Sequence, residues 1–212
     1  QGKKVKEFED EWSQYTGAKF SIAVTSCTSA MHLSLEALGL SEKDEIIVPA
    51  FTWISTANVV EHVGAKLKFC DIDLETFNIN IDQLKSSITS KTKAIIPVHL
   101  FGLPANMKEI VSLAKERGLF IIEDAACGFA SFFQGKHAGT FGDTGCFSFH
   151  PRKSITTGEG GMITTNNKKL AEKIKSIRDH GAVISDHQRH LGPKPYLLSD
   201  HKYAGYNQRM TD

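Results

Sequence analysis

The sequence lacks several features that would assign it to a special class of protein. Among 212 residues, Lys and Arg number 25 against 24 for Asp and Glu, so no excess charge favours nucleic acid or an anionic membrane surface. No apolar run approaches the roughly 18 residues that span a bilayer. Residues 1–11 are charged and lack the apolar core of a signal peptide. We therefore expect a cytoplasmic protein with neither nucleic-acid nor membrane partners.

Cysteine motifs and nucleotide-binding motifs are missing as well. The four cysteines form no CxxC pair, which argues against a zinc site or a disulfide framework. His187 and His190 lie three residues apart without an evident third ligand, so we expect no metal site. No GxxxxGK[ST] is present, and no GxGxxG follows the first expected strand. A Rossmann-type nucleotide site is therefore weakly supported.

Strands and helices instead alternate along the first 122 residues. We expect a helix at 5–15 that Gly17 ends, and a short buried strand at 20–24. Hydrophobic spacing then predicts strands at 45–48, 66–69, 94–98 and 119–122. It predicts the intervening helices after Ser26 and at 54–63, 82–88 and 107–116. This order predicts an α/β fold with three layers (α/β/α) around a mostly parallel mixed sheet.

The second part of the chain has a different pattern. Residues 135–165 are rich in glycine and predict short strands, and residues 168–178 predict an amphipathic helix. Residues 181–212 show little periodicity and predict an extended loop. Because no closing element follows, we expect residues 1–212 to be one large domain of a natural chain that continues beyond Asp212.

One candidate for chemistry is a lysine in the glycine-rich segment 148–161. Lys153 is followed by hydroxyl residues and by Gly160 and Gly161, which would also suit an ordinary surface loop. Alternatively, partial desolvation makes the lysine amine a nucleophile near neutral pH, and paired glycines allow close backbone approach to a ligand. Ser148 could offer its hydroxyl to a phosphate.

Two further signals occur earlier in the chain. Glu123 and Asp124 end an apolar strand. They either form an ordinary turn at the strand end, or Asp124 faces a ligand crevice and pairs with a buried cation such as a pyridinium nitrogen. Residues 26–29 lie at a strand-to-helix junction, where they cap the helix and could also present backbone N–H groups to a phosphate. Each signal is ambiguous alone, but a phosphate turn, an acid and a lysine in this order are much less expected by chance.

The sequence resembles the DegT/StrS-type sugar aminotransferases, which are fold type I pyridoxal-phosphate (PLP) enzymes, over nearly its whole length. The matching segments are 25–30, 49–53, 69–73, 97–102, 123–126, 139–143, the segment around Lys153, 178–181 and 205–210. The resemblance implies that Lys153 forms the Schiff base with PLP and that Asp124 pairs with the pyridine nitrogen. It places Trp53 against the cofactor ring, although a tryptophan of the core is the alternative.

The resemblance also implies a phosphate site and a dimer. Thr28 and Ser148, with backbone amides near Ser29, resemble the phosphate cup. Asn207 matches an asparagine that reaches the phosphate of the neighbouring subunit, which implies a homodimer with shared active sites.

The chain departs from the family pattern at two cysteines. Cys27 replaces a common glycine, so the phosphate turn must tolerate a side chain. Cys127 replaces a Gln or His that contacts the cofactor ring or its phenolic oxygen, and it either makes a weaker contact there or packs inertly.

The implied activity is transfer of an amino group from glutamate or glutamine to a nucleotide-diphosphate keto sugar, in amino-sugar and polysaccharide biosynthesis. The alternatives are a PLP- or PMP-dependent sugar dehydratase, which typically has His at the lysine position, a PLP-binding regulatory protein without turnover, and a structural fragment. Arg152, Arg189 and Lys194 are candidates for binding the diphosphate, or are simply solvated surface charges.

Overall fold

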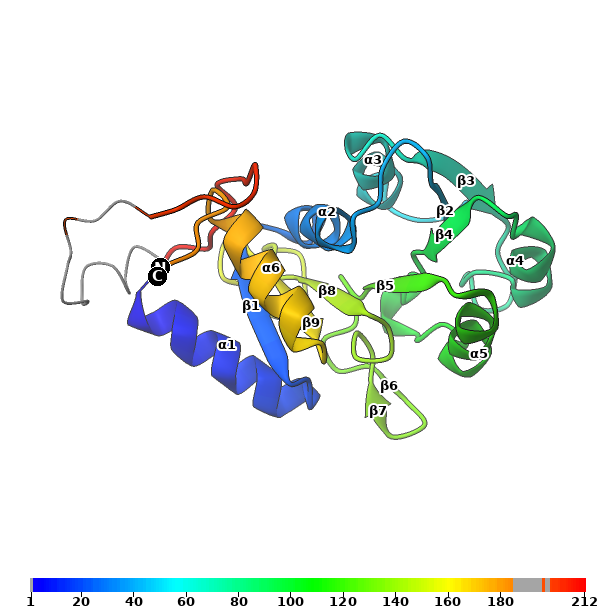
Figure 1. Ribbon diagram of the computed structural model, residues 1–212. Coiled ribbons are helices and arrows are strands. Elements are labelled where there is room, and N and C mark those ends of the chain that lie inside the picture. Colours follow the sequence, from blue (N-terminus) through cyan, green and yellow to red (C-terminus); the bar gives the residue numbers. More distant parts are fainter. Residues whose placement is uncertain (1, 185–195, 197–198) are drawn as a thin grey trace.

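The computed structural model of the protein describes residues 2–184, 196 and 199–212 (Figure 1). Its helices are α1 (Lys3–Thr16), α2 (Cys27–Leu38), α3 (Ser55–His62), α4 (Ile81–Ser87), α5 (Met107–Arg117) and α6 (Lys168–Arg178), with a short 3-10 helix at Leu100–Gly102. Its strands are β1 (Phe20–Val24), β2 (Glu45–Pro49), β3 (Lys66–Cys70), β4 (Thr92–Ile95), β5 (Phe120–Asp124), β6 (Phe132–Phe133), β7 (Lys136–His137), β8 (Thr144–Ser148) and β9 (Gly161–Thr165).

The main sheet has seven strands in the order β1-β9-β8-β5-β4-β2-β3. Neighbours from β3 across to β8 are parallel, whereas β9 runs antiparallel to both β8 and β1. The pair β6-β7 forms a small separate hairpin. The expected mostly parallel mixed sheet is thus confirmed.

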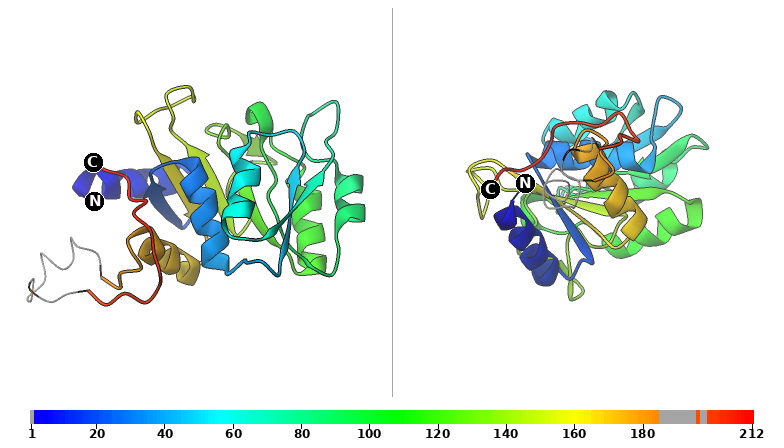
Figure 2. Two further views of the ribbon diagram at one scale, coloured as in Figure 1. Left: turned by 90° about the horizontal axis from the view of Figure 1, so that it is seen from above. Right: turned by 60° about the vertical axis from the view of Figure 1, so that its left-hand side comes forward.

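Helices cover both faces of this sheet (Figures 1 and 2). Successive side chains of a strand point to opposite faces, so Ile46 packs in the cluster that contains residues of α2, α3 and α6, while Ile47 packs with residues of α4 and α5. Helix α1 covers β1 on the side opposite α2, where Trp12 meets Ala23. The three-layer prediction is confirmed.

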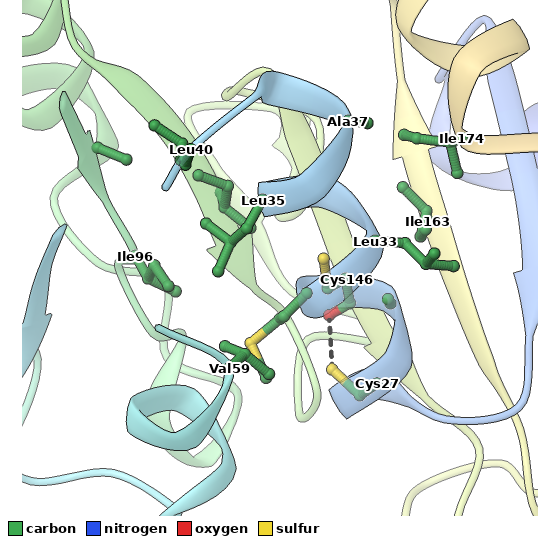
Figure 3. Packing of buried hydrophobic residues seen from close by; sticks show 14 of the residues in the cluster. Cys27, Leu33, Leu35, Ala37, Leu40, Val59, Ile96, Cys146, Ile163 and Ile174 are labelled. Atoms are coloured by element: carbon green, nitrogen blue, oxygen red, sulfur yellow. Dashed lines mark hydrogen bonds between the residues drawn. The ribbon is translucent and has the colours of Figure 1, made fainter. Parts of the chain in front are cut away.

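Helix α2 lies at the centre of the largest apolar cluster (Figure 3). Leu33 and Leu35 are fully buried, and burial of such a side chain contributes about 1.5–3 kcal/mol. The helix begins at Cys27 because the Ser26 hydroxyl caps it, and it ends at Leu38 because Gly39, with φ 79°, caps its carboxyl end. This packing fixes the amino end of α2 against the sheet.

Two strand ends differ from the sequence expectation. Strand β4 ends at Ile95 instead of residue 98, because Pro97 has no N–H to continue the ladder. Strand β5 extends to Asp124, since the Asp124 N–H donates to the Pro97 carbonyl at 2.9 Å. The two acids therefore belong to the strand itself.

The described residues near the end of the chain make backbone contacts with earlier parts of the fold. Among the described residues, isolated β-bridges join Ala182 to His201, Asp179 to Asn207 and Val24 to Arg209. The described ends of the chain lie side by side (Figure 2), and the Gly2 N–H donates to the Asp212 carboxylate at 3.0 Å. Among the described residues, no helix combines the length and apolar character needed to cross a membrane.

Candidate functional site

A cavity of about 440 Å³ opens at the carboxyl ends of the parallel strands, where ligands bind in open α/β sheets. Four connections line it: the β1–α2 turn, the β2–α3 loop, the end of β5 and the loop after β8. Its wall consists of Ser26, Cys27, Thr28, Trp53, Ser55, Asp124, Ala126, Ser148, His150, Arg152, Lys153 and Glu159. The topology therefore brings together the three signals found in the sequence.

Asp124 presents a buried carboxylate to this cavity and is only 4% exposed. Its Oδ2 accepts a hydrogen bond from Thr56 Oγ1 at 2.8 Å, and its Oδ1 accepts one from the Ala126 N–H at 3.1 Å. Carboxylate oxygens accept more than one hydrogen bond each. Asp124 can therefore bind a cationic N–H donor from the cavity while its own orientation stays fixed.

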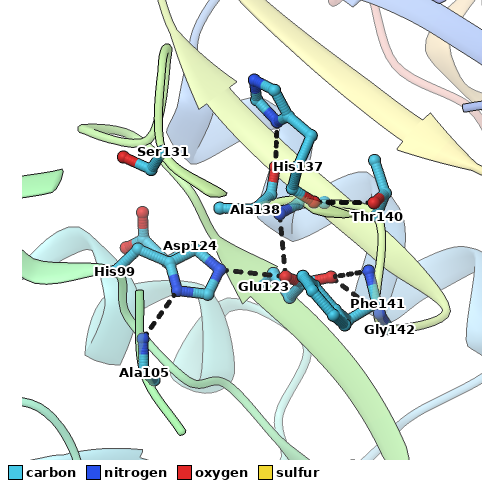
Figure 4. A network of polar contacts seen from close by, with 12 residues as sticks. His99, Ala105, Glu123, Asp124, Ser131, His137, Ala138, Thr140, Phe141 and Gly142 are labelled. Atoms are coloured by element: carbon cyan, nitrogen blue, oxygen red, sulfur yellow. Dashed lines mark hydrogen bonds and ion pairs between the residues drawn. The ribbon is translucent and has the colours of Figure 1, made fainter. Parts of the chain in front are cut away.

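Glu123 points to the opposite face and has a different environment (Figure 4). It is fully buried, and its Oε2 lies 2.9 Å from Nε2 of His99. Its carboxylate also accepts hydrogen bonds of 2.6–2.8 Å from the backbone N–H groups of Gly139, Phe141 and Gly142. The Ala105 N–H donates to Nδ1 of His99 at 3.2 Å, so the imidazole tautomer with its proton on Nε2 satisfies both contacts. Glu123 thus holds the loop after β7 against β5.

The amino end of α2 has open backbone donors. The N–H of Ser29 itself donates to Ser26 Oγ at 3.0 Å, so the open amides near Ser29 are those that precede it. Within the described residues, the N–H groups of Cys27 and Thr28 have no acceptor, as is usual in the first turn of a helix. These two amides and the helix dipole favour an anion at this end of the cavity.

The side chain of Cys27 does not obstruct the turn. It is buried, and its Sγ donates to the carbonyl oxygen of Cys146 at 3.3 Å. Burial and the nearby Asp124 raise the pKa of the Cys27 thiol well above its usual value, so the thiol stays neutral. The turn therefore tolerates a side chain here, as expected.

Gly161 allows β9 to pass directly against this turn. A Cβ at position 161 would lie 2.3 Å from the carbonyl carbon of Ser26 and 2.7 Å from the nitrogen of Cys27. Real Cβ atoms do not approach other atoms so closely, so only glycine fits. Gly161, the second of the paired glycines after Lys153, thus shapes the site by close packing of backbone on backbone.

Lys153 lies in the loop after β8 and reaches the cavity. Backbone hydrogen bonds from Phe149 to the Gly160 carbonyl and from Thr157 to the Phe149 carbonyl close this loop, at 2.9 and 3.1 Å. The half-buried Lys153 donates from Nζ to Cys127 Sγ at 3.3 Å. Lys153 also lines an adjoining cavity of about 270 Å³ that Cys127 borders. Cys127 is exposed beside the lysine, and its contact with a cofactor stays a prediction.

The remaining predicted residues line the cavity, lie outside its wall, or fall outside the described residues. Trp53 is 72% exposed in the cavity wall, so the alternative of a core tryptophan is wrong. Thr28 and Ser148 line the same cavity, whereas the exposed Asn207 lies outside its wall, and its reach into a neighbouring subunit stays a prediction. Arg152 lines the cavity. The candidates outside the described residues are His187, Arg189, His190 and Lys194. In the part of the chain that the structure describes, no cluster of three metal-ligating side chains occurs.

The sequence reasoning missed several residues of the site. Ser55, His150 and Glu159 line the cavity, and Thr56 binds Asp124 from 68 residues away in sequence. His150 and Glu159 flank the lysine segment, so their proximity could have been anticipated. No local signal connects Thr56 to Asp124, because only the fold brings α3 beside the end of β5.

This donor set fits a small ligand with three distinct groups. A lysine amine can bind a carbonyl carbon covalently, a buried carboxylate can pair with a protonated ring nitrogen, and the amino end of α2 can hold a phosphate. The three lie in the wall of one cavity. Pyridoxal phosphate carries these three groups, so the residues present fit it.

Comparison with known proteins gives consistent matches over the whole chain. The model of the DegT/DnrJ/EryC1/StrS aminotransferase family matches residues 1–212. GDP-perosamine synthase of Escherichia coli O157:H7 is 42% identical over 211 residues, which cover 100% of this chain and 55% of that protein. The spore coat polysaccharide biosynthesis protein SpsC of Bacillus subtilis is also 42% identical over 211 residues and is covered over 54% of its length.

Solved structures also match over nearly the whole chain. An aminotransferase from Psychrobacter cryohalolentis superimposes with a TM-score of 0.93 at 35% identity, over 99% of this chain and 53% of that one. The GDP-4-keto-6-deoxy-D-mannose-3-dehydratase of E. coli with bound hydrated PLP superimposes with a TM-score of 0.88 at 33% identity, over 99% of this chain and 57% of that one. The chain thus spans about half the length of the relatives it matches.

Proposed function

This chain belongs to the DegT/DnrJ/EryC1/StrS aminotransferase family, and we propose that it is the cofactor-binding large domain of a PLP-dependent sugar aminotransferase. The single observation that carries the proposal is the shared cavity of Lys153, Asp124 and the amino end of α2. When bound, PLP supplies an electron sink for the carbon from which a proton is removed.

The residues of this chain would divide the work of binding. Lys153 would hold the cofactor covalently through Nζ, and Asp124 would keep a proton on the ring nitrogen. Thr28, Ser148 and the open amides of α2 would bind the phosphate. The exposed indole of Trp53, which already stands in the wall, would cover one face of the ring.

Lys153 would also move a proton. When not bound to the cofactor, Nζ of Lys153 would be a free amine in the same cavity and could hold or move a proton there. The thiol of Cys127 lies 3.3 Å from Nζ, in the wall of the adjoining cavity, and would be a polar neighbour of this amine. The donor we propose is glutamate or glutamine.

The acceptor we propose is a keto sugar joined to a nucleotide diphosphate, in the biosynthesis of amino sugars for polysaccharide. The names of the two curated relatives, a GDP-perosamine synthase and a spore coat polysaccharide protein, support this class. Arg152, in the cavity wall next to Lys153, is the described cation best placed to meet an anionic part of the substrate. We place the enzyme in the cytoplasm, in line with its free thiols.

We propose that the enzyme is a homodimer with shared active sites. Phe51, Trp53 and Ile54 are 48%, 72% and 60% exposed beside the cavity, and such a group of apolar side chains suits a protein interface. Asn207 is exposed and free to reach a neighbouring subunit. A partner at this surface would close the cavity from solvent.

The dehydratase that superimposes on the chain makes a PLP-dependent dehydratase the second candidate. The presence of Lys153 favours the aminotransferase, because an amine at this position can both hold the cofactor and transfer the proton. A regulatory protein that binds PLP without turnover would retain the same cavity, and only turnover distinguishes it.

The test uses the purified full-length protein and its Lys153→Ala variant. We expect the wild type to bind PLP with a visible absorbance band, to retain it covalently after borohydride reduction at Lys153, and to lose the band when glutamate is added. Lys153→Ala should show neither the band nor the attachment. A wild type without a band, or an unchanged variant, would refute the proposal.

A further inference from the structure

Two threonines that lie behind the candidate site form a chain of hydrogen bonds to Asp124. Thr56 is fully buried in the first turn of α3, and its Oγ1 lies 2.8 Å from Asp124 Oδ2. Thr52, in the loop before α3, has its Oγ1 3.1 Å from that of Thr56. Neither threonine lines the cavity, so neither would contact a ligand in it.

The direction of this chain follows from the chemistry of Asp124. An ionised carboxylate accepts hydrogen bonds only, so the Thr56 hydroxyl must donate its single proton to Asp124. The oxygen of Thr56 can then only accept from Thr52, which makes Thr52 the donor. Each donor polarises the next group, which strengthens the final bond to the carboxylate.

The same threonines connect Asp124 to the loop that carries Trp53. Trp53 follows Thr52 directly, and the bond from Thr52 to Thr56 spans the turn that holds the indole in the cavity wall. Helix α3 has no side-chain cap of its own, since its N-cap residue is Ile54. This polar chain therefore ties together the loop that presents the indole and the carboxylate of the neighbouring strand.

We propose that Thr56, assisted by Thr52, is a positioning residue for the cofactor, because it fixes the Asp124 carboxylate in the orientation that meets the ring nitrogen. The proposal rests on the proposed function of the site. Without the Thr56 hydroxyl, the backbone N–H of Ala126 would still hold Oδ1. Oδ2 would lose the one side-chain donor within 3 Å that the structure gives it.

The experiment measures PLP affinity by equilibrium dialysis of the full-length protein, which needs no turnover. We expect Thr56→Val to weaken PLP binding about tenfold, since bonds to charged groups are the stronger ones. Thr56→Ser, which keeps the hydroxyl, should stay within about threefold of the wild type, and Thr52→Val should weaken binding about threefold.

A double-mutant cycle separates positioning from general stability. If Thr56 acts through Asp124, Thr56→Val should change the affinity less than about twofold in an Asp124→Ala background. The matched control is Thr165→Val, which removes a buried hydroxyl that donates to the Asp143 carbonyl at 2.7 Å, away from the cavity. It should lower the thermal midpoint of the apo protein without changing PLP affinity.

The outcomes distinguish the two proposals. An unchanged affinity in Thr56→Val, or an equal loss with and without Asp124, overturns the positioning role while leaving the cofactor site intact. A wild type that binds no PLP, or an Asp124→Ala variant that binds as well as the wild type, overturns the proposed function and this inference with it.

Discussion

The buried carboxylate of Glu123 gives the sharpest test of how the site is supported. Its two oxygens accept four hydrogen bonds, from His99 and from three backbone N–H groups. In Glu123→Gln one oxygen becomes an amide NH₂. If the remaining oxygen serves Phe141 and Gly142, the NH₂ faces the donors of His99 and Gly139. His99 cannot simply reverse its tautomer, because its Nδ1 already accepts from the backbone of Ala105.

Two buried donors without acceptors cost about 1–3 kcal/mol each, so we expect Glu123→Gln to lower the free energy of unfolding by about 4 kcal/mol. Such a loss is a large part of the 5–15 kcal/mol typical of a folded domain. At roughly 2–4 °C per kcal/mol for a domain of this size, the thermal midpoint should fall by about 8–16 °C.

The assay is differential scanning fluorimetry of the full-length protein, supported by urea unfolding. The control is Glu116→Gln, because the side chain of Glu116 is 66% exposed and pairs with its neighbour Arg117 at the surface; the midpoint of this variant should stay within about 2 °C of the wild type. A Glu123→Gln midpoint equally close to the wild type would refute the reasoning that this network holds the loop after β7.

Three further predictions concern the cavity. Gly161→Ala should lower PLP affinity about tenfold or more and cost roughly 1–3 kcal/mol of stability, because the added Cβ overlaps the Ser26 carbonyl carbon. An unchanged affinity in equilibrium dialysis would contradict the close approach of Gly161 to Ser26. Trp53→Ala should leave the thermal midpoint nearly unchanged, since the indole is 72% exposed, but lower PLP affinity about tenfold through lost stacking; a large fall of the midpoint would indicate a core role instead. In thiol titration of the folded protein at pH 8, the exposed Cys127 should react fast, and PLP should slow its reaction. Burial raises the pKa of Cys70 to about 11, so this thiol stays protonated at pH 8. A fast-reacting thiol in the Cys127→Ser variant would contradict this prediction. The thiols expected to stay unreactive are Cys27, Cys70 and Cys146.

The sequence predicted most of the architecture because periodicity records which face of an element is buried. Helix ends were clear where glycine stops a helix, as at Gly17 with φ 77°. The end of β4 was placed too late, because hydrophobic spacing continues through residue 98 while Pro97 interrupts the ladder. The order of strands in the sheet, with β9 inserted between β1 and β8, depends on long-range pairing that periodicity does not record.

The candidate site was predicted in part. Lys153 and Asp124 stand in motifs that local sequence shows, and the structure brings both into one cavity wall. Backbone amides near Ser29 were expected to face the ligand, and which of them are open depends on the cap: the Ser29 N–H is bound by Ser26, and this is known only once the helix start is known. Thr56 carried no signal, because its contact with Asp124 depends on how α3 packs beside β5.

The place of β9 in the sheet has a consequence for folding during synthesis. Strand β1 pairs along its whole length with β9. Phe20 therefore gains its sheet partner, Thr165, only after 145 more residues have been synthesised. At about 5–20 residues per second, the ribosome needs on the order of ten seconds to supply β9. Until then the turn before α2 lacks the strand that passes against it at Gly161. Cofactor uptake should therefore be a late event, and during this interval β1 and the β8 edge of the sheet should both be unpaired and open to chaperones.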